Sequence, residues 1–421
     1  MTSTQTVAEP VGSEDHAASP WRRRVADLWP PFVALLAAWA MIAFRSPYGG
    51  ARLFSPSSYA RWDTGHYLHI ARTGYYSITC DPSRLPKALP PGDYLCGNIG
   101  WFPGYPAAIR GLSEVTRMSV PIAALVVAWT FWYVALLLMW RLLAGARSPA
   151  TRWACLLIAA FFPGQVYMAA LFPISLCIAG ILGCLYVALR TTRPVYAWAG
   201  FAAGFVAAYS YITAIVLAPA LLVVALVAYR GRQRWQAIIP ATGAVAGFAS
   251  VLLTMQIAVG QWDAYFVSVK KYNVGAHMPL DTLRDRLRPL WQSVGSARVL
   301  EVRSWQTLLA LCFVLVAIAA TMAGAVRRNP PEAGALAARL RTALDRRVSA
   351  FDLCFVMMSV GVWLVPYIAG GSASTYRSEA FVVVCVPLLR KLPAWLLVLP
   401  LGASVFVAWN MATYFFNRQL V

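Results

Sequence analysis

Charged residues are scarce in this sequence, and acidic residues most of all. Only 12% of the 421 residues are charged and 60% are hydrophobic, whereas soluble domains carry roughly 25% charged residues. The 16 acidic residues stand against 36 basic ones, which gives a formal net charge of +20. This composition excludes a soluble globular protein and indicates a basic membrane protein.

Motifs for nucleotides and metals are also missing. The sequence has no GxxxxGK[ST] phosphate loop and no Rossmann glycine fingerprint, so it carries no local signature of nucleotide binding. No CxxC pair or Cys/His array offers a zinc site. We therefore expect neither a metal nor another cofactor, and no nucleic-acid partner.

Long apolar runs are abundant. Runs of about 20 residues recur, each enough to cross roughly 30 Å of hydrocarbon as a helix. They predict an all-α polytopic membrane protein with about 11 transmembrane helices, in a single membrane domain over residues 26–421. The predicted spans are 28–44, 120–140, 153–172, 174–189, a hairpin over 195–229 that turns near 210–213, 236–259, 305–326, 351–369, 379–389 and 394–416. The run 379–389 is short, and it either crosses fully or re-enters.

The arginines predict the orientation in the membrane. Residues 1–25 are polar and are expected to form a disordered N-terminus. The "WRRR" at 21–24 favours the cytoplasm for this end, because basic residues tend to stay inside. Segments 46–119 and 260–304 then become large outer loops. Their basic surplus suits an anionic partner such as a lipid phosphate, although an arginine-rich composition explains it equally well.

Two of the eight cysteines differ from the rest. Cys80 and Cys96 flank the segment "DPSRLPKALPPGDYL" in the first outer loop. In an oxidising compartment, a disulfide between them would pin this proline-rich excursion, and closing such a loop contributes roughly 3 kcal/mol. The other six lie in predicted spans, where a small packing residue is the simplest role for cysteine.

The stretch "RWDTGHYLHIARTGYY" at 61–76 is unusually polar for a segment beside a membrane span. Its spacing predicts a helix with Asp63, His66 and Tyr67 on one face, and its aromatic rings are typical of a membrane interface. Asp63 has two structural explanations: a charge favoured at a helix N-terminus, or the partner of Arg61. A catalytic carboxylate is the third, and local physics leaves the choice open.

A second stretch, "WFPGYPAAIR" at 101–110, combines prolines with aromatic residues. It predicts a rigid turn that docks the first loop back on the membrane domain. Together the two stretches resemble the PIG-V-type family, that of glycosylphosphatidylinositol mannosyltransferase II, and its bacterial relatives. The match comprises Trp62, Asp63, Ile70, Ala71, Gly74 and Tyr75, followed by the structural motif Phe102, Pro103, Tyr105 and Pro106.

The resemblance extends to "FFPGQVYMAALFPISL" at 161–176, which is similar to the family's third-span pattern. It departs from that pattern at Ile174, where the family has an acidic residue. The resemblance implies a C-type glycosyltransferase (GT-C) fold, with the active site at the outer face of a helix bundle. It also implies the transfer of mannose from a polyprenyl-phosphate carrier to a lipid, glycan or protein acceptor. The active site would then lie on the extracytoplasmic face of a bacterial cytoplasmic membrane.

Given this resemblance, Asp63 is the candidate general base, and direct displacement would invert the anomeric centre. The leaving phosphate needs cations. Arg377 in "TYRSEA" is the first candidate, because a guanidinium can clamp phosphate oxygens bidentately. The alternatives are Arg110, Lys270 and Lys271. The substrate-binding candidates beside Asp63 are Trp62, His66 and Tyr67.

Two other classes of protein remain. A catalytically degenerate relative, which binds lipid-linked sugar or stabilises a partner enzyme, is consistent with the departure at Ile174. A lipid or solute transporter would often show repeated halves and ionisable residues at mid-membrane. No repeat is obvious here, and the ionisable residues lie mostly in loops and at span ends. The sequence therefore favours a membrane mannosyltransferase.

Overall fold

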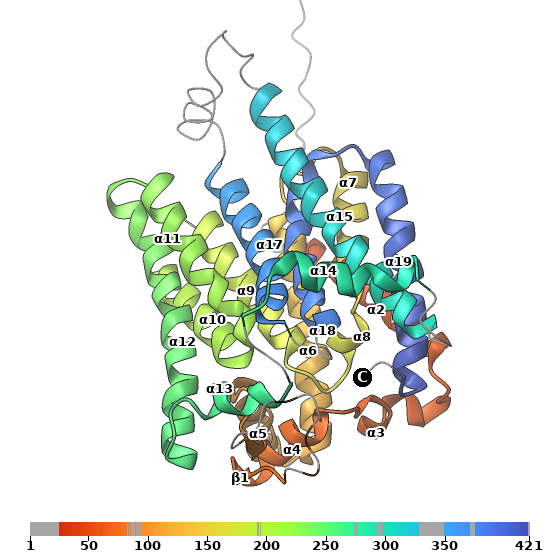
Figure 1. The fold of residues 1–421 in the computed structure, drawn as a ribbon. Helices are drawn as coiled ribbons and strands as arrows, with labels where there is room; N and C mark the ends of the chain where they lie inside the picture. The colour runs from red at the N-terminus through yellow and green to blue at the C-terminus, as the bar shows by residue number, and fades with distance from the viewer. Residues whose placement is uncertain are drawn as a thin grey trace, which may run out of the picture.

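The computed structural model describes residues 25–419 apart from 82, 84, 86–88, 90–93, 192, 194, 273–275, 293–297, 328–348 and 371–374 (Figure 1). The predicted disordered N-terminus, residues 1–25, lies outside this range except for its last residue. The described chain is mostly helical. Figure 1 shows long helices side by side in one bundle, with short elements gathered at its lower end.

The long helices correspond closely to the apolar runs of the sequence. Five of them are long and apolar enough to span a membrane: Val120–Leu142, Gly231–Val259, Glu301–Met322, Ala350–Ala369 and Ala394–Phe416. Shorter apolar helices accompany them, and the chain is an integral membrane protein. The bundle comprises α2 (Trp29–Arg45), α6 (Val120–Leu142), α7 (Pro149–Ala160), α9 (Ile174–Arg190), α10 (Tyr196–Ser210), α11 (Leu217–Val227), α12 (Trp235–Val259), α15 (Arg298–Arg327), α17 (Ala350–Ala369) and α19 (Ala394–Phe416).

Small residues let neighbouring helices approach closely. A Cβ atom on Gly243 of α12 would lie 2.2 Å from the carbonyl oxygen of Phe201 in α10. One on Gly247 would lie 2.3 Å from the carbonyl oxygen of Phe205. Only glycine allows this backbone contact, which van der Waals packing then stabilises in a membrane. The turn predicted within 195–229 lies where expected, since α10 ends at Ser210 and η3 (Ile212–Val216) leads into α11.

The predicted span 153–172 is wrong as a continuous helix. Helix α7 ends at Ala160, and residues 161–173 form an irregular segment that includes only the short α8 (Val166–Ala169). Pro163 lacks the amide hydrogen that a helix needs, and Gly164 has φ of 90°, which side-chain-bearing residues rarely adopt. The segment is almost wholly buried, as non-helical backbone at membrane depth must be.

The short run 379–389 crosses the bundle. At its start, the Tyr367 hydroxyl near the end of α17 donates to Glu379. At its end, Arg390 and Lys391 bind Asp352 near the start of α17. The run is formed by α18 (Thr375–Glu379) and the 3₁₀ helix η7 (Ala380–Lys391). A 3₁₀ helix rises about 2.0 Å per residue against 1.5 Å in an α-helix, so a short segment covers the length of α17.

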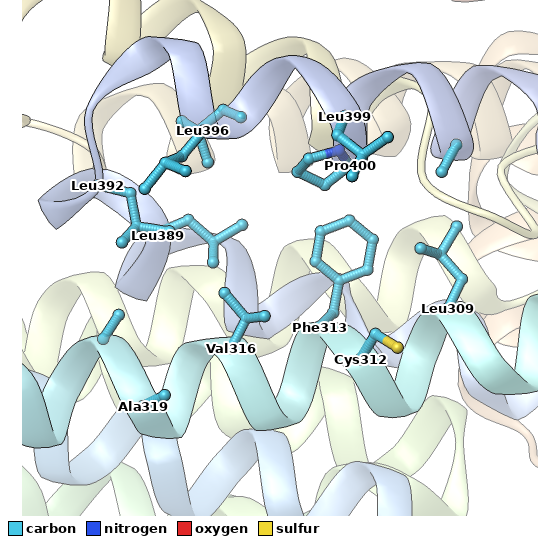
Figure 2. Close-up of a pocket in the computed structure, with 13 residues that line it drawn as sticks. Leu309, Cys312, Phe313, Val316, Ala319, Leu389, Leu392, Leu396, Leu399 and Pro400 are labelled. Atoms are coloured by element: carbon cyan, nitrogen blue, oxygen red, sulfur yellow. The ribbon is translucent and has the colours of Figure 1, made fainter.

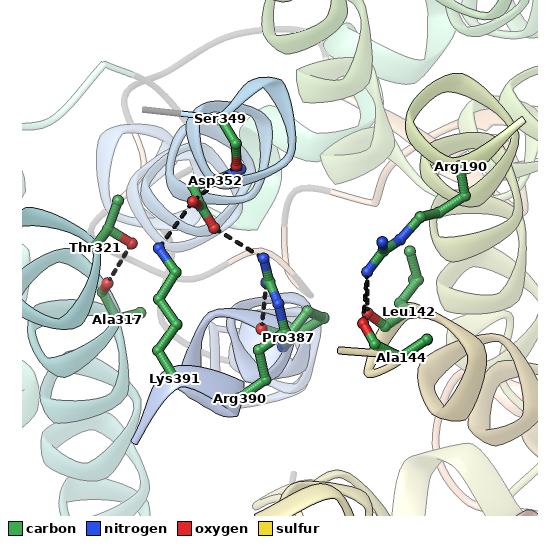
Figure 3. A network of polar contacts seen from close by, with 10 residues as sticks. All are labelled: Leu142, Ala144, Arg190, Ala317, Thr321, Ser349, Asp352, Pro387, Arg390 and Lys391. Atoms are coloured by element: carbon green, nitrogen blue, oxygen red, sulfur yellow. Dashed lines mark hydrogen bonds and ion pairs between the residues drawn. The ribbon is translucent and has the colours of Figure 1, made fainter. Parts of the chain in front are cut away.

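Charged side chains fasten the end of the bundle where α17 begins, here called the far end. Figure 3 shows the buried Asp352 carboxylate accepting from Arg390 Nη2 at 3.1 Å and from Lys391 Nζ at 2.8 Å. Arg190 at the end of α9 donates to the carbonyls of Leu142 and Ala144, where α6 ends. These bonds join η7 to α17 and α9 to α6.

Residues 46–119 and 260–272 lie at the opposite end, here called the site end, whereas residues 279–290 lie nearer the middle of the molecule in this view (Figure 1). Residues 46–119 supply η1 (Gly50–Phe54), α3 (Pro56–Tyr59), α4 (Thr64–Thr73), α5 (Gly104–Thr116) and the antiparallel strands β1 (Ser77–Thr79) and β2 (Leu95–Gly97). Residues 260–304 supply α13 (Ala264–Val269), η5 (Lys270–Tyr272), α14 (Pro279–Leu287) and η6 (Arg288–Leu290). Ile78 pairs with Cys96, which is disulfide-bonded to Cys80.

Candidate functional site

An ion pair joins Asp63, just before α4, to Arg377 in α18. Arg377 Nη1 donates to Asp63 Oδ2. The Asp63 side chain makes no capping hydrogen bond to α4. Arg61, the other partner considered, donates instead to the carbonyls of Ser57 and Ala60 and to the Tyr48 hydroxyl. The carboxylate therefore makes no capping hydrogen bond and does not pair with Arg61, although Asp63 does occupy the N-cap position of α4.

The backbone just before Asp63 is strained. Trp62 has φ of 45°, in the left-handed region that a bulky side chain rarely occupies. Its ring packs edge-on against Phe415 of α19, with 5.5 Å between ring centroids. Such strain persists only where the surroundings enforce it, and it concentrates at functional sites. Here it accompanies the turn that places the carboxylate against α18.

Aromatic rings surround the Arg377 guanidinium, which is 7% exposed as a residue. Its Cζ atom lies 5.3 Å from the ring centroid of Phe172 and 5.8 Å from that of Tyr376. Phe172 belongs to the irregular segment 161–173, so the break in the predicted span brings a ring to the site. The next residue, Ser378, lies 3.4 Å from the hydroxyl of Tyr211. These contacts hold α18 in place beside Asp63.

His66 lies close to both Asp63 and Lys271. Its ring stacks on Trp101, with centroids 3.7 Å apart and planes 12° apart. Burial lowers the pKa of His66, and the nearby Asp63 only partly opposes this effect. Burial also lowers the pKa of Lys271, whose Nζ donates to Leu95 O and Ser268 Oγ. The His66 imidazole therefore interacts with the Asp63 carboxylate on one side and with a buried ammonium on the other.

The aromatic and proline motif docks the first loop on the bundle, as predicted. Tyr67 packs against Tyr105 and Phe172, with ring centroids 5.7 and 6.3 Å apart. The Tyr105 hydroxyl donates to the carbonyl of Ala124 in α6 at 2.9 Å. Phe102 packs against Tyr265, a residue of α13. Pro103 immediately precedes α5, and Pro106 lies buried in its first turn. These residues are buried and position α4, and the Tyr67 hydroxyl lies close enough to Asp63 and Arg377 to interact with both electrostatically.

Two of the basic residues predicted to bind phosphate, Arg110 and Lys270, lie away from the ion pair. Arg110 donates from Nε to Ala71 O at 2.8 Å and from Nη2 to Ile70 O at 3.0 Å. These are carbonyls of the last turn of α4, which a cation is well suited to cap. Lys270 is exposed. Of the residues predicted to bind phosphate, Arg377 pairs with Asp63 and Lys271 lies near His66.

Sequence reasoning missed three charged residues of this region. The Arg303 Cζ atom in α15 lies 4.8 Å from the ring centroid of Tyr376. Glu379 is buried and accepts from Thr307 Oγ1 and from the Tyr367 hydroxyl, each at 2.7 Å. Arg286 of α14 interacts electrostatically with Glu379, and burial lowers its pKa. Of these three, only Glu379 could have been found from the sequence, because it belongs to the same "TYRSEA" stretch as Arg377.

An apolar groove runs along α15, between the end of η7 and α19 (Figure 2). Its volume is about 730 Å³. Several of its lining residues are exposed on the outside of the bundle, with Leu399 82% exposed and Val316 43% exposed. The lining residues are Leu309, Cys312, Phe313, Val316, Ala319, Ala320, Leu389, Leu392, Leu396, Leu397, Leu399, Pro400 and Ala403. Lipid chains or an isoprenoid match this surface chemically.

Metal-binding side chains do not gather in the described part of the chain. No group of three or more His, Cys, Asp or Glu residues there is placed to hold a metal ion. Ile174, at the position where the resembled family is acidic, is 1% exposed and begins α9 in the core. The chemistry that this site offers is therefore that of one carboxylate facing one guanidinium, with aromatic surroundings.

The fold is similar to that of solved oligosaccharyltransferases from Archaeoglobus fulgidus. One of these, tethered with an acceptor peptide containing the NVT sequon, matches 94% of this chain with a TM-score of 0.50 and 11% identity. A second structure, in complex with an inhibitory peptide and a dolichol-phosphate, also covers 94% of this chain, with a TM-score of 0.49 and 11% identity.

The chain spans 56% of the length of either oligosaccharyltransferase. No protein-family model matches it, and no curated protein is significantly similar to it. The likeness therefore concerns the fold.

Proposed function

We propose that this protein is a membrane glycosyltransferase of the PIG-V type, which moves mannose from a polyprenyl-phosphate donor to an acceptor hydroxyl. The observation that carries the proposal is the Asp63–Arg377 ion pair at one end of a GT-C-like bundle. It sets a carboxylate beside a guanidinium, the two groups that such a transfer needs at its reacting centre.

The chemistry assigns one role to each group. The acceptor oxygen forms a bond to the anomeric carbon while the bond from that carbon to the phosphate oxygen breaks. Asp63 takes the acceptor proton, a contribution of roughly a hundredfold to ten-thousandfold. Arg377 stabilises the charge left on the polyprenyl phosphate. A direct displacement of this kind inverts the anomeric centre, so a β-linked donor gives an α-mannoside.

Two features support a lipid-linked donor. The groove along α15 is apolar and open to the outside of the bundle, which suits an isoprenoid tail. The site end also offers Arg303 and Lys271 in addition to Arg377, which suits an anionic headgroup. The acceptor is a lipid, a glycan or a protein hydroxyl.

The site end is proposed to face the outside of a bacterial cytoplasmic membrane. Basic residues such as Arg190, Arg390 and Lys391 gather at the far end, as expected of cytoplasmic segments. The disulfide between Cys80 and Cys96 belongs to the site end and suits an oxidising compartment. Donor and acceptor would then meet outside the cell.

A donor panel tests this function. The purified protein, in lipid nanodiscs, is given radiolabelled polyprenyl-phosphate mannose or polyprenyl-phosphate glucose with a membrane extract as acceptor. We expect the label to move from mannose donor to acceptor, with the anomeric configuration inverted. Transfer from glucose alone would overturn the assignment of mannose. Failure with both donors, by folded protein, would favour a catalytically inactive partner or a transporter.

A further inference from the structure

Two arginines from different parts of the chain lie near the ring of Tyr376. Arg303 in α15 and Arg377 in α18 place their Cζ atoms 4.8 and 5.8 Å from its centroid. Arginine cations near an aromatic face are attracted to its electrons, and two guanidiniums near one ring form a site for a divalent anion. Arg303 also lies 3.4 Å from the carbonyl oxygen of Gln419, beyond the end of α19.

Asp63 and a donor phosphate would compete for Arg377. A carboxylate oxygen that already accepts from a guanidinium is less available to take the acceptor proton. A guanidinium nitrogen that donates to that oxygen is less available to phosphate. The pair therefore occupies Asp63 Oδ2 and Arg377 Nη1, one atom of each group that the transfer needs.

The two partners are not equally fixed. Among the described residues, the Asp63 carboxylate hydrogen-bonds only to Arg377, and 28% of its side chain is exposed. Arg377 is 8% exposed in its side chain and packs against Phe172 and Tyr376. The carboxylate can therefore leave while the guanidinium stays. Its departure is unfavourable unless another anion replaces it, because a buried unpaired charge is costly.

We propose that the phosphate of the donor binds between Arg303 and Arg377 and takes Arg377 away from Asp63, which becomes free to act as the base. This inference rests on the proposed function and adds the order in which its steps occur. The donor binds first, and Asp63 can accept the acceptor proton only afterwards. When polyprenyl phosphate leaves, Asp63 loses its proton to solvent and pairs with Arg377 again.

Equilibrium binding of a polyprenyl phosphate, measured without any transfer, tests the exchange. The full-length protein in nanodiscs binds labelled polyprenyl phosphate as the wild type, Asp63→Asn, Arg377→Gln and the double variant. We expect Asp63→Asn to tighten binding about tenfold, because a competing anion is removed. In the Arg377→Gln background, Asp63→Asn should have no further effect.

This double-mutant cycle separates competition from simple repulsion. Tightening by Asp63→Asn of equal size in both backgrounds would mean that Asp63 merely repels the phosphate, and would overturn the exchange. Unchanged or weaker binding by Asp63→Asn alone would overturn it as well. If Arg377→Gln does not fold, Arg377→Lys provides the second background, since it keeps the charge and loses the bidentate fork.

The role of Arg303 has its own variant. Arg303→Gln should weaken binding of polyprenyl phosphate at least tenfold, whereas the matched control Arg284→Gln, at an exposed position of α14, should not. Equal affinities of the two variants would remove Arg303 from the site. If the cycle behaves as expected but no polyprenyl-phosphate sugar supports transfer, the phosphate site stands and the proposed function fails. If the wild-type protein transfers the sugar but the cycle shows no coupling, the proposed function stands and the phosphate site fails.

Discussion

Asp63 and Arg377 lie 314 positions apart in the chain and form an ion pair at the site end of the bundle. Asp63 follows the first membrane helix, and Arg377 lies in α18, just before the 3₁₀ helix η7 that packs along α17. The pair therefore joins the first loop to the last part of the bundle. The packing that positions each partner leads to separate predictions.

The close contact between α5 and the end of α10 predicts that Gly104→Ala is destabilising. The added methyl would lie 2.4 Å from Ser210 Oγ and 2.8 Å from Ser210 N, so one of the two helices must move. We expect a loss of about 1–3 kcal/mol in the free energy of unfolding, measured by denaturant titration in detergent. Gly111→Ala in the same helix is the control, because nothing lies within 4 Å of its added methyl. Equal stability of the two variants would refute this packing.

Arg110 is predicted to stabilise α4 and not to bind phosphate. Arg110→Gln removes two charge-assisted bonds to the carbonyls of Ile70 and Ala71, and we expect a loss of about 1 kcal/mol in unfolding free energy. The KM for the donor should not change. The exposed Arg72→Gln serves as the control on the same helix. A raised donor KM at unchanged stability would restore Arg110 as a phosphate ligand.

The buried Asp352 is predicted to fasten the far end of the bundle. Asp352→Asn leaves Arg390 and Lys391 without their carboxylate, and breaking such a buried pair costs roughly 3 kcal/mol. We expect lower thermal stability and an unchanged donor KM at a temperature where the variant is folded. Asp285→Asn, at an exposed position of α14, is the control. A wild-type melting temperature for Asp352→Asn would contradict the role of this cluster in holding η7.

His66 is predicted to make stability depend on pH. Burial against Trp101 lowers the pKa of His66 below its ordinary 6.5, so the folded state binds this proton less readily than the unfolded state. The contribution of the neutral ring is fully present above 6.5 and is lost as the pH falls towards the lowered folded value. The wild-type melting temperature should therefore fall more than that of His66→Gln between about pH 7.5 and pH 5. The exposed His69→Gln is the control, and parallel curves for His66→Gln and the wild type would contradict the prediction.

The sequence predicts the helices well where apolar runs are continuous, and it predicts the docking of "WFPGYPAAIR" because prolines and aromatic rings have strong local preferences. It fails at 153–172, where Pro163 and Gly164 break a run that is apolar enough to span. Hydropathy cannot register that break, because a buried irregular segment is as apolar as a helix.

Long-range partners are harder to predict. The resemblance and the physical argument indicated Asp63 and Arg377 separately, but only the fold brings them together. Arg286 in α14 and Arg303 near the start of α15 carry no local pattern, and the ring of Tyr376 that Arg303 contacts lies 73 positions further along the chain. The cap formed by Arg110 also depends on how α5 lies against α4, which no spacing in the sequence specifies.

The most direct test of the central claim is the rate of mannose transfer by Asp63→Asn in a single turnover with saturating polyprenyl-phosphate mannose. The account predicts a rate lower than that of the wild type by a factor of about 10² to 10⁴, while the variant remains folded and binds polyprenyl phosphate at least as tightly. Transfer by Asp63→Asn at the wild-type rate would contradict Asp63 as the general base.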